Sequence, residues 1–360
     1  MKKKLVTLVL LGLLLLAGGL GMLTGHRELS LGERRKLAQW PKLTGAALLS
    51  GSFTSSADKA AADQFPFREF FRRGKALYVT YVLGQPDNNG IYVTDGSAAK
   101  LDYPLSQSSL RHAIDRIQNI VDNYLSGTQV RCYYSVIPDK NYFLGNSLGY
   151  PVMDYDRLLD ELSGSLSMTY LDLFETLSPE DYYRTDPHWR QECLEPVASS
   201  LARGMGLPFS SAFETVTLGR FSGAYAGQSA LPLEPDSLCY LENETLRGCT
   251  AYDPVSGDPV PIYDPDKLDS RDPYDLFLGG ALPLVVLENP NGPAGRELVL
   301  FRDSFGSSLA PLLAASYSKI TLVDLRYMDS SLLGDYVTFS HQDVLFLYST
   351  LLLNSSQSLR

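Results

Sequence analysis

The C-terminal third of the chain holds a strand, a helix and a second strand in close succession, and this pattern constrains the fold most. Residues 298–301 are continuously apolar and predict a buried strand, and residues 308–316 predict a helix. Residues 320–325 predict the second strand. A helix that joins two parallel strands of one sheet forms a right-handed βαβ unit. The chain is therefore expected to contain a parallel sheet of the α/β class.

Elements upstream of this unit extend the same alternation. Apolar positions at spacings of three and four predict a helix over residues 108–124, which leads into a strand over residues 130–137. Apolar residues at every fourth position predict another helix over residues 189–205, which Pro196 should kink or split. Helices that alternate with buried strands predict a three-layer α/β body.

The N-terminus carries an apolar run long enough to cross a membrane. Lys2, Lys3 and Lys4 precede residues 5–23, which contain no charge and no proline. We expect an uncleaved signal anchor within residues 1–26, with the body outside the cell. A cleaved signal peptide, which would leave a secreted protein, is the alternative, and a buried core helix is the third interpretation.

The rest of the chain divides by composition. Residues 27–62 are polar and predict a stalk or linker, and residues 63–360 predict the folded body. Within the body, residues 210–290 are rich in Gly, Pro and Asp and predict an irregular insertion that contains β-strands. With 44% hydrophobic and 20% charged residues, the composition is that of a globular protein. The net charge of -10 argues against a nucleic-acid partner.

The four cysteines have no C-x-x-C spacing, which argues against a zinc site. If the body is extracellular, these thiols face an oxidising space. Cys239 and Cys249 flank a polar stretch that could turn back on itself, so we expect them to form a disulfide. Cys132 and Cys193 are expected to be buried thiols, and the sequence leaves that interpretation open for all four cysteines.

Ser304 lies in the turn between the strand and the helix of the βαβ unit. A serine at such a turn is presented at the carboxyl edge of the sheet, where α/β active sites lie. The backbone N–H groups of Phe305 and Gly306 would then lie beside an oxyanion. The alternative is that Asp303 or Ser304 only caps the helix.

His188 follows Asp186 by two residues, and the chain has only four histidines. A serine nucleophile needs a base to accept its proton, and that imidazole needs a carboxylate to fix its tautomer. Ser304, His188 and Asp186 supply all three groups. An Asp-x-His pair could instead bind a metal, but no third ligand is evident, and a purely structural pair is the other alternative.

Five short blocks of sequence together resemble the DHHW family of Gram-positive bacteria. That family is similar to the AlgX and AlgJ group of SGNH-hydrolase-like polysaccharide O-acetyltransferases. The chain departs from the family motif at Pro187, where the family has histidine, but it keeps the carboxylate, the second histidine and the tryptophan. The blocks are residues 136–140, 185–189, 277–280, 301–306 and 323–327.

The resemblance implies an SGNH-hydrolase-like fold with Ser304 as the nucleophile and with Asp186 and His188 as its partners. Lys140 and Arg326 match family positions, and Lys140 could bind an anionic sugar or acyl donor or form a structural ion pair. Gly279 and Gly280 could donate an N–H group to an oxyanion or could serve only as turn glycines.

These observations lead us to expect an exported, membrane-anchored serine O-acetyltransferase that acts on an envelope polysaccharide. A membrane-bound O-acyltransferase could supply the acetyl group, and we expect no cofactor. Tyr183 and Trp189 flank the catalytic residues and could stack on a sugar, although aromatic residues are as often core residues. A carbohydrate acetyl esterase and a non-catalytic envelope or spore-coat scaffold are the alternatives.

Overall fold

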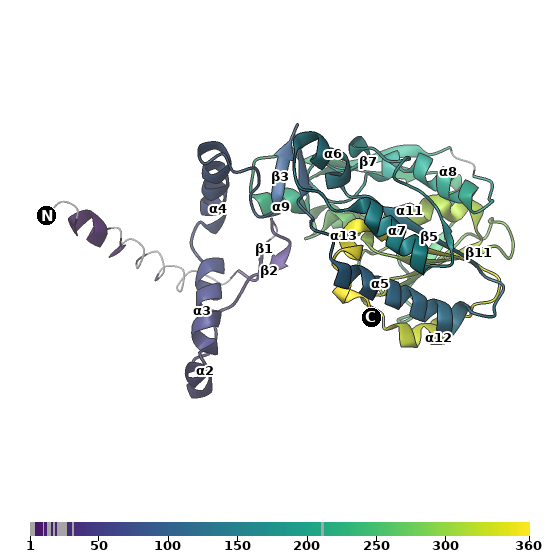
Figure 1. Ribbon diagram of the computed structural model, residues 1–360, viewed down its shortest axis with the longest axis horizontal. Helices are drawn as coiled ribbons and strands as arrows, with labels where there is room; N and C mark the ends of the chain where they lie inside the picture. The colour runs from purple at the N-terminus through teal and green to yellow at the C-terminus, as the bar shows by residue number, and fades with distance from the viewer. Residues whose placement is uncertain are drawn as a thin grey trace. The chain divides into compact units, whose positions relative to one another are not determined.

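The computed structural model describes residues 4–9, 11–12, 16, 19, 27–30, 32–209 and 212–360 (Figure 1). The chain divides into two compact units, which we treat separately. Unit 1 comprises Met1–Tyr92 and Ala224–Glu234, and unit 2 comprises Val93–Gly223 and Pro235–Arg360.

Among the residues that the structure describes, no helix is both long enough and apolar enough to span a membrane. The apolar run predicted as a signal anchor, residues 5–23, falls partly outside the described residues, and His26 falls outside them as well.

Unit 1 is mostly helical. Thr44 caps the N-terminus of helix α2 (Gly45–Leu49), because its side chain accepts a hydrogen bond from the Ala47 N–H group. Helix α4 continues directly into a π-helical turn, Tyr78–Val82. The elements of unit 1 are β1 (Leu29–Ser30), β2 (Arg35–Lys36), α2 (Gly45–Leu49), α3 (Ser52–Asp63), α4 (Arg68–Leu77) and α9 (Ala224–Ser229). Strand β3 (Ile91–Thr94) follows and pairs with β4 (Ser97–Lys100).

Unit 2 is built on a mixed sheet of seven strands in the order β6-β5-β13-β11-β12-β10-β9. The first five strands of that order are parallel to one another, and β10 pairs antiparallel with β12 on one side and with β9 on the other. The sheet is therefore mostly parallel, as the sequence predicts. The strands are β5 (Arg131–Ile137), β6 (Thr169–Tyr170), β9 (Thr250–Tyr252), β10 (Leu284–Glu288), β11 (Glu297–Arg302), β12 (Lys319–Val323) and β13 (Asp343–Ser349).

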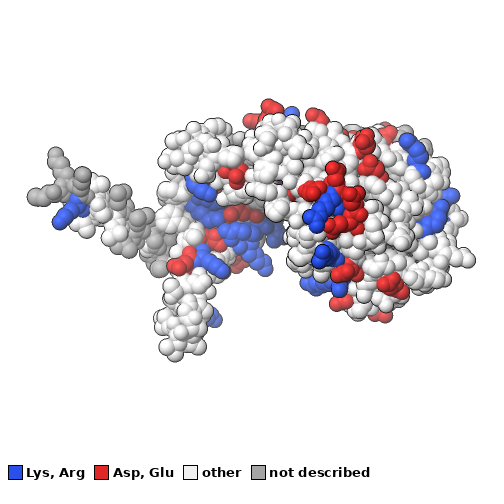
Figure 2. Space-filling model, viewed as in Figure 1, with Lys and Arg blue, Asp and Glu red and all other residues white. Residues whose placement is uncertain are grey.

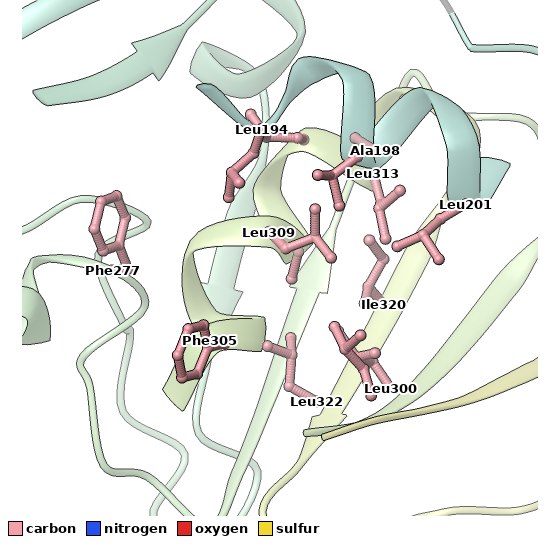
Figure 3. Packing of buried hydrophobic residues seen from close by; sticks show 14 of the residues in the cluster. Leu194, Ala198, Leu201, Phe277, Leu300, Phe305, Leu309, Leu313, Ile320 and Leu322 are labelled. Atoms are coloured by element: carbon pink, nitrogen blue, oxygen red, sulfur yellow. The ribbon is translucent and has the colours of Figure 1, made fainter. Parts of the chain in front are cut away.

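Helices cover both faces of this sheet because successive side chains of a strand point to opposite faces. Leu298 and Leu300 of β11 pack with α8 (Glu195–Gly204) and α11 (Ser304–Leu313). Val299 and Phe301 of the same strand pack on the other face with α5 (Gln107–Ile120) and α7 (Tyr155–Ser165). Figure 3 shows the first face, where leucines of α11 lie between α8 and the strands.

The segment predicted as an insertion has two structural parts. Strands β7 (Glu214–Phe221) and β8 (Asp236–Glu242) pair with each other, with an irregularity between Thr217 and Gly219. Strands β9 and β10 instead join the central sheet. The shorter helices of unit 2 are α6 (Lys140–Leu148), α10 (Glu244–Arg247), α12 (Leu333–Tyr336) and α13 (Thr350–Leu353).

The helix expected over residues 189–205 is shorter than predicted. Helix α8 begins at Glu195, with Pro196 in its first turn, and a separate 3-10 turn covers Gln191–Cys193. Proline is tolerated in the first turn because its missing N–H group would have no intrahelical acceptor there. Pro196 therefore starts this helix and does not kink it, which leaves His188 and Trp189 in a loop.

Candidate active site

Ser304, His188 and Asp186 form one hydrogen-bonded chain. Ser304 is the first residue of α11, directly after β11, and the other two residues lie in the loop that precedes the Gln191–Cys193 turn. His188 Nε2 lies 2.7 Å from Ser304 Oγ, and His188 Nδ1 lies 2.6 Å from Asp186 Oδ1. The structure therefore brings together the three residues that the sequence singles out as catalytic.

The burial of the three groups falls off from the carboxylate to the hydroxyl. Asp186 is fully buried, His188 is 7% exposed and Ser304 is half-buried. Asp186 Oδ1 also accepts the backbone N–H group of His188 at 3.2 Å. A carboxylate beside Nδ1 favours the tautomer in which Nδ1 carries the proton, so Nε2 is free to accept the Ser304 proton.

Two aromatic rings fix the imidazole plane. The Tyr274 ring stacks on His188, with centroids 3.8 Å apart and planes 8° apart, and the Phe305 ring lies 4.8 Å away. The Tyr274 hydroxyl lies 2.7 Å from Ser308 Oγ, which also accepts the Trp189 indole N–H at 2.8 Å. The loop and α11 are thus joined through one buried serine.

Asp303 shapes the turn that presents Ser304. One of its oxygens accepts the Phe305 N–H group at 3.1 Å, and the other accepts both the N–H and the hydroxyl of Ser349 at the end of β13. Two residues after Ser304, glycine is required at position 306 because a Cβ atom there would lie 2.5 Å from Arg302 Cβ. Asp303 is the helix cap that the sequence suggested, and the capping leaves the Ser304 side chain available to His188.

Lys140 and Asp236 hold the main chain just before Asp186. The buried Lys140 ammonium donates to the Tyr183 carbonyl at 2.8 Å and to the Arg184 carbonyl at 3.3 Å. The Asp236 carboxylate accepts the N–H groups of Arg184 at 2.8 Å and Thr185 at 2.7 Å, together with the Thr185 hydroxyl. Burial lowers the pKa of Lys140 to about 7, although nearby carboxylates, Asp186 first, oppose that shift.

Gly223 lies against the same loop. Its N–H group donates to Thr185 Oγ1 at 2.7 Å. A Cβ atom at residue 223 would overlap the Thr185 carbonyl and Asp186 Cβ, so no larger residue fits without moving the loop.

The expected oxyanion donors are engaged elsewhere. The Phe305 N–H group donates to the Asp303 side chain, and the Gly306 N–H group donates to the Asp303 carbonyl at 3.1 Å. Gly280 donates its N–H group to the Phe277 carbonyl, and Gly279 and Gly280 both have a positive φ, as turn glycines do. The assignments of residues 305, 306 and 280 are corrected, because their N–H groups serve local structure, whereas the oxyanion role of Gly279 stays a prediction.

The four residues suggested for substrate binding have structural partners. Tyr183 and Trp189 are fully buried and Lys140 is buried, so they offer no exposed surface to a sugar. Arg326 is paired with the buried Asp324, at 2.6 Å from Nη2 to Oδ2, and Asp324 also pairs with the buried Arg302 at 3.1 Å. Burial therefore gives Tyr183, Trp189 and Lys140 a role in the core, whereas Arg326 is paired but partly exposed and its role in substrate binding stays a prediction.

The expected disulfide between Cys239 and Cys249 is not formed, since both residues are free thiols. Cys249 donates to the Thr245 carbonyl, and Cys239 Sγ lies 3.5 Å from Thr217 Oγ1 in the neighbouring strand. The polar stretch between the two cysteines contains the end of β8 and all of α10, so each thiol has its own local partner.

Three residues that contact the site come from the segment predicted as an insertion: Gly223, Asp236 and Tyr274. No spacing or motif in the sequence distinguishes them, because the chain has 29 glycines, 22 tyrosines and 41 acidic residues. Within the described part of the chain, no group of three or more His, Cys, Asp or Glu residues is placed to hold a metal ion.

An open cavity of about 520 Å³ borders the loop. Its lining includes Arg184 of the loop, Asp236, which holds the loop, and the acidic residues Asp95 and Glu180. Both signs of charge therefore face the cavity.

No protein-family model matches the chain. No curated protein matches it either. Among solved structures, a DHHW family protein from Eubacterium siraeum has a TM-score of 0.60 and 20% identity, with 76% of this chain and 94% of that chain covered. Bacillus cereus PatB1 with a sulfonyl adduct has a TM-score of 0.58 and 18% identity, with 73% and 95% covered.

The O-acetyltransferase domain of Pseudomonas putida AlgJ is less similar, with a TM-score of 0.43 and 13% identity over 74% of this chain and 92% of that chain. The Eubacterium siraeum structure belongs to the DHHW family that the sequence motifs resemble, so that resemblance is confirmed at the level of the fold. The chain has the fold of a DHHW family protein.

Proposed function

We propose that the protein is a serine O-acyltransferase of the SGNH type that moves an acetyl group to a hydroxyl of an envelope polysaccharide. The observation that carries the proposal is the hydrogen-bonded chain from Asp186 through His188 to Ser304. A hydroxyl held 2.7 Å from an imidazole that is itself held by a buried carboxylate is the arrangement that activates a serine nucleophile.

In the first step, Ser304 Oγ attacks the carbonyl carbon of an acetyl donor while His188 Nε2 takes the hydroxyl proton. The tetrahedral intermediate collapses when the donor's leaving group accepts that proton from His188, which leaves acetyl-Ser304. The N–H groups of the first helical turn have no intrahelical acceptors, and that of Ser304 is nearest to the reacting carbon. We assign it to the oxyanion, where the α11 dipole also favours negative charge.

In the second step, a sugar hydroxyl replaces the leaving group. His188 Nε2 takes its proton as the oxygen attacks the acetyl carbonyl, and the same proton returns to Ser304 Oγ when the ester bond to Ser304 breaks.

The proposal includes export and anchoring by the N-terminal apolar run, with the body outside the cell and a membrane-bound O-acyltransferase as the acetyl donor. The run of residues 5–23 after Lys2, Lys3 and Lys4 supports the anchor. A sulfonyl adduct is named for PatB1, which shares the fold, and this makes sulfonyl fluorides a suitable probe of Ser304.

The test is covalent labelling of the full chain by a sulfonyl fluoride or fluorophosphonate, with peptide mapping. We expect the label on Ser304 and its loss in Ser304→Ala. Ser331→Ala, which changes an exposed serine, is the matched control and should label normally. Labelling of Ser304→Ala equal to that of the wild type would remove Ser304 from the mechanism.

Transfer is separated from hydrolysis by partition of the acetyl-enzyme. With an activated acetyl ester and a panel of envelope glycans, acetylated glycan should form faster than free acetate. If no glycan competes with water while acetylated glycans lose their acetyl groups, the protein is an esterase and the transferase proposal fails.

A further inference from the structure

The two units of the chain carry opposite net charges. Unit 1, Met1–Tyr92 with Ala224–Glu234, has 13 Lys and Arg against 7 Asp and Glu, which gives +6, or +3 without Lys2, Lys3 and Lys4, which the proposed anchor places on the other side of the membrane. The whole chain carries -10, so unit 2 carries -16. Figure 2 shows Lys and Arg side chains gathered on unit 1 where α3 is followed by α4. Unit 1 is therefore the part of the chain that anionic surfaces attract.

Helix α4 and the π-helical turn after it expose a continuous apolar stripe. Phe67 is 74% exposed, Phe70 71%, Tyr81 73% and Val82 69%. The exposed apolar residues recur at the three- and four-residue intervals that place side chains on one face of a helix. We call this surface the α4 stripe; its members are Phe67, Phe70, Phe71, Tyr78, Tyr81 and Val82.

The opposite face of α4 carries the contacts to the rest of unit 1. Arg68 pairs with Glu33 at 2.6 Å, and Arg72 donates to the Gly227 carbonyl at 2.7 Å. Ala76 on that side is fully buried. Helix α4 thus uses its charged residues for packing and turns its apolar residues outward, the reverse of an ordinary surface helix.

A group of large apolar side chains exposed side by side marks an interaction site. Phenylalanine and tyrosine on one face, with exposed basic residues such as Arg73 and Lys75 nearby, are typical of helices that lie in the headgroup region of a bilayer. The apolar run of residues 5–23 belongs to the same unit. A cationic unit with an outward aromatic stripe is complementary to anionic lipid, and unit 2 is not.

We propose that the α4 stripe docks onto the surface of an anionic lipid bilayer, with the Phe and Tyr rings at the level of the headgroups. The docking goes beyond acyl transfer and does not depend on it. It would give unit 1 a second membrane contact in addition to the proposed anchor.

The test places a tryptophan on the stripe in the full chain, reconstituted into phosphatidylcholine vesicles with or without phosphatidylglycerol. Phe70→Trp should show blue-shifted emission and quenching by acyl-brominated lipid, and more of both with phosphatidylglycerol present. Tyr336→Trp, at a 42% exposed residue of α12 in unit 2, is the matched control and should show neither change. The wild type, with Trp40 and Trp189, supplies the background.

Equal quenching of Phe70→Trp and Tyr336→Trp would overturn the proposal. If the emission of Phe70→Trp were blue-shifted in vesicle-free detergent, in which the chain self-associates, the proposal would be overturned in favour of a second copy of the chain. Protection by a co-purified protein, without lipid quenching, would overturn it in favour of a protein partner. Fluorophosphonate labelling of Ser304 in the same vesicles reports the proposed chemistry separately, so either proposal can fail while the other stands.

Discussion

Lys140 and Asp236 hold the same short segment of main chain through charges of opposite sign. Lys140 donates to the carbonyl groups of Tyr183 and Arg184, and Asp236 accepts the N–H groups of Arg184 and Thr185. Asp186 comes next in the chain, so its side chain is attached to a backbone whose preceding carbonyl and N–H groups are both held by hydrogen bonds. Catalytic geometry depends on such support because small displacements of a reacting group cost large factors in rate.

Asp236→Asn should weaken both the fold and the site. An amide group has one acceptor oxygen, whereas the carboxylate accepts three hydrogen bonds from residues 184 and 185. Loss of buried, charge-assisted bonds costs about 1.5 to 3 kcal/mol. Urea unfolding should show a loss of that order, and the Ser304 labelling rate should fall. Asp258→Asn, at an exposed carboxylate, is the control and should change neither quantity.

Lys140→Met should change how stability depends on pH. Burial lowers the pKa of Lys140 to about 7 in the folded state, below its ordinary value of 10.5. Between these values the unfolded chain binds the extra proton, so rising pH favours the folded wild type. The free energy of unfolding of the wild type should therefore gain on that of the variant by up to about 1.4 kcal/mol per pH unit above pH 7. A constant difference in urea unfolding between pH 6 and pH 9 would contradict the lowered pKa.

The parallel sheet and the three catalytic candidates could be read from the sequence for physical reasons. Buried parallel strands are apolar on both faces, so runs such as residues 298–301 are conspicuous. Histidine is rare in this chain, and His188 stands out because a carboxylate lies two residues before it. Chemistry that needs an uncommon residue is easier to locate than packing that any apolar residue can supply.

The surroundings of the site could not be predicted in the same way. Gly223, Asp236 and Tyr274 act through contacts between segments that are distant in the chain, and none of them has a local signature. Spacing shows that the N–H groups of residues 305 and 306 lie at the start of a helix, which is why the sequence points to them as oxyanion donors. Spacing does not show that the Asp303 side chain accepts the N–H group of residue 305 and that the Asp303 carbonyl accepts that of residue 306. The start of α8 was missed because a proline in a first turn and a proline at a kink have the same sequence pattern.

Gly223→Ala should displace the loop that carries Asp186. The added methyl group would overlap the Thr185 carbonyl and Asp186 Cβ, neither of which is the end of a flexible side chain. Overpacking of this kind costs about 1 to 3 kcal/mol. Thermal unfolding should show that loss, and labelling of Ser304 should slow.

The control for Gly223→Ala is Gly164→Ala in α7, where an added Cβ meets nothing within 4 Å. Helix propensity predicts that it is neutral or stabilising by up to about 1 kcal/mol. If the two alanine variants behaved alike, close packing at residue 223 would not be what positions the loop.

Tyr274 should affect the site through its ring more than through its hydroxyl. The ring stacks on His188 at 3.8 Å and limits rotation of the imidazole, whereas the hydroxyl bonds to Ser308. Tyr274→Phe keeps the stack, so Ser304 labelling should stay close to that of the wild type. Tyr274→Leu removes the stack, and labelling should slow by about 10-fold, the factor that corresponds to about 1.4 kcal/mol of lost stacking.

The folded fraction of the Tyr274 variants distinguishes this role from a loss of folding. Tyr274→Leu should lower the maximal labelling rate and leave the folded fraction, measured by circular dichroism at the same temperature, unchanged. If Tyr274→Phe were as slow as Tyr274→Leu, the hydrogen bond to Ser308 would be the important contact. Ser308→Ala, which keeps the stack and removes that bond, would then be equally slow, whereas the stacking argument expects it to label faster than Tyr274→Leu.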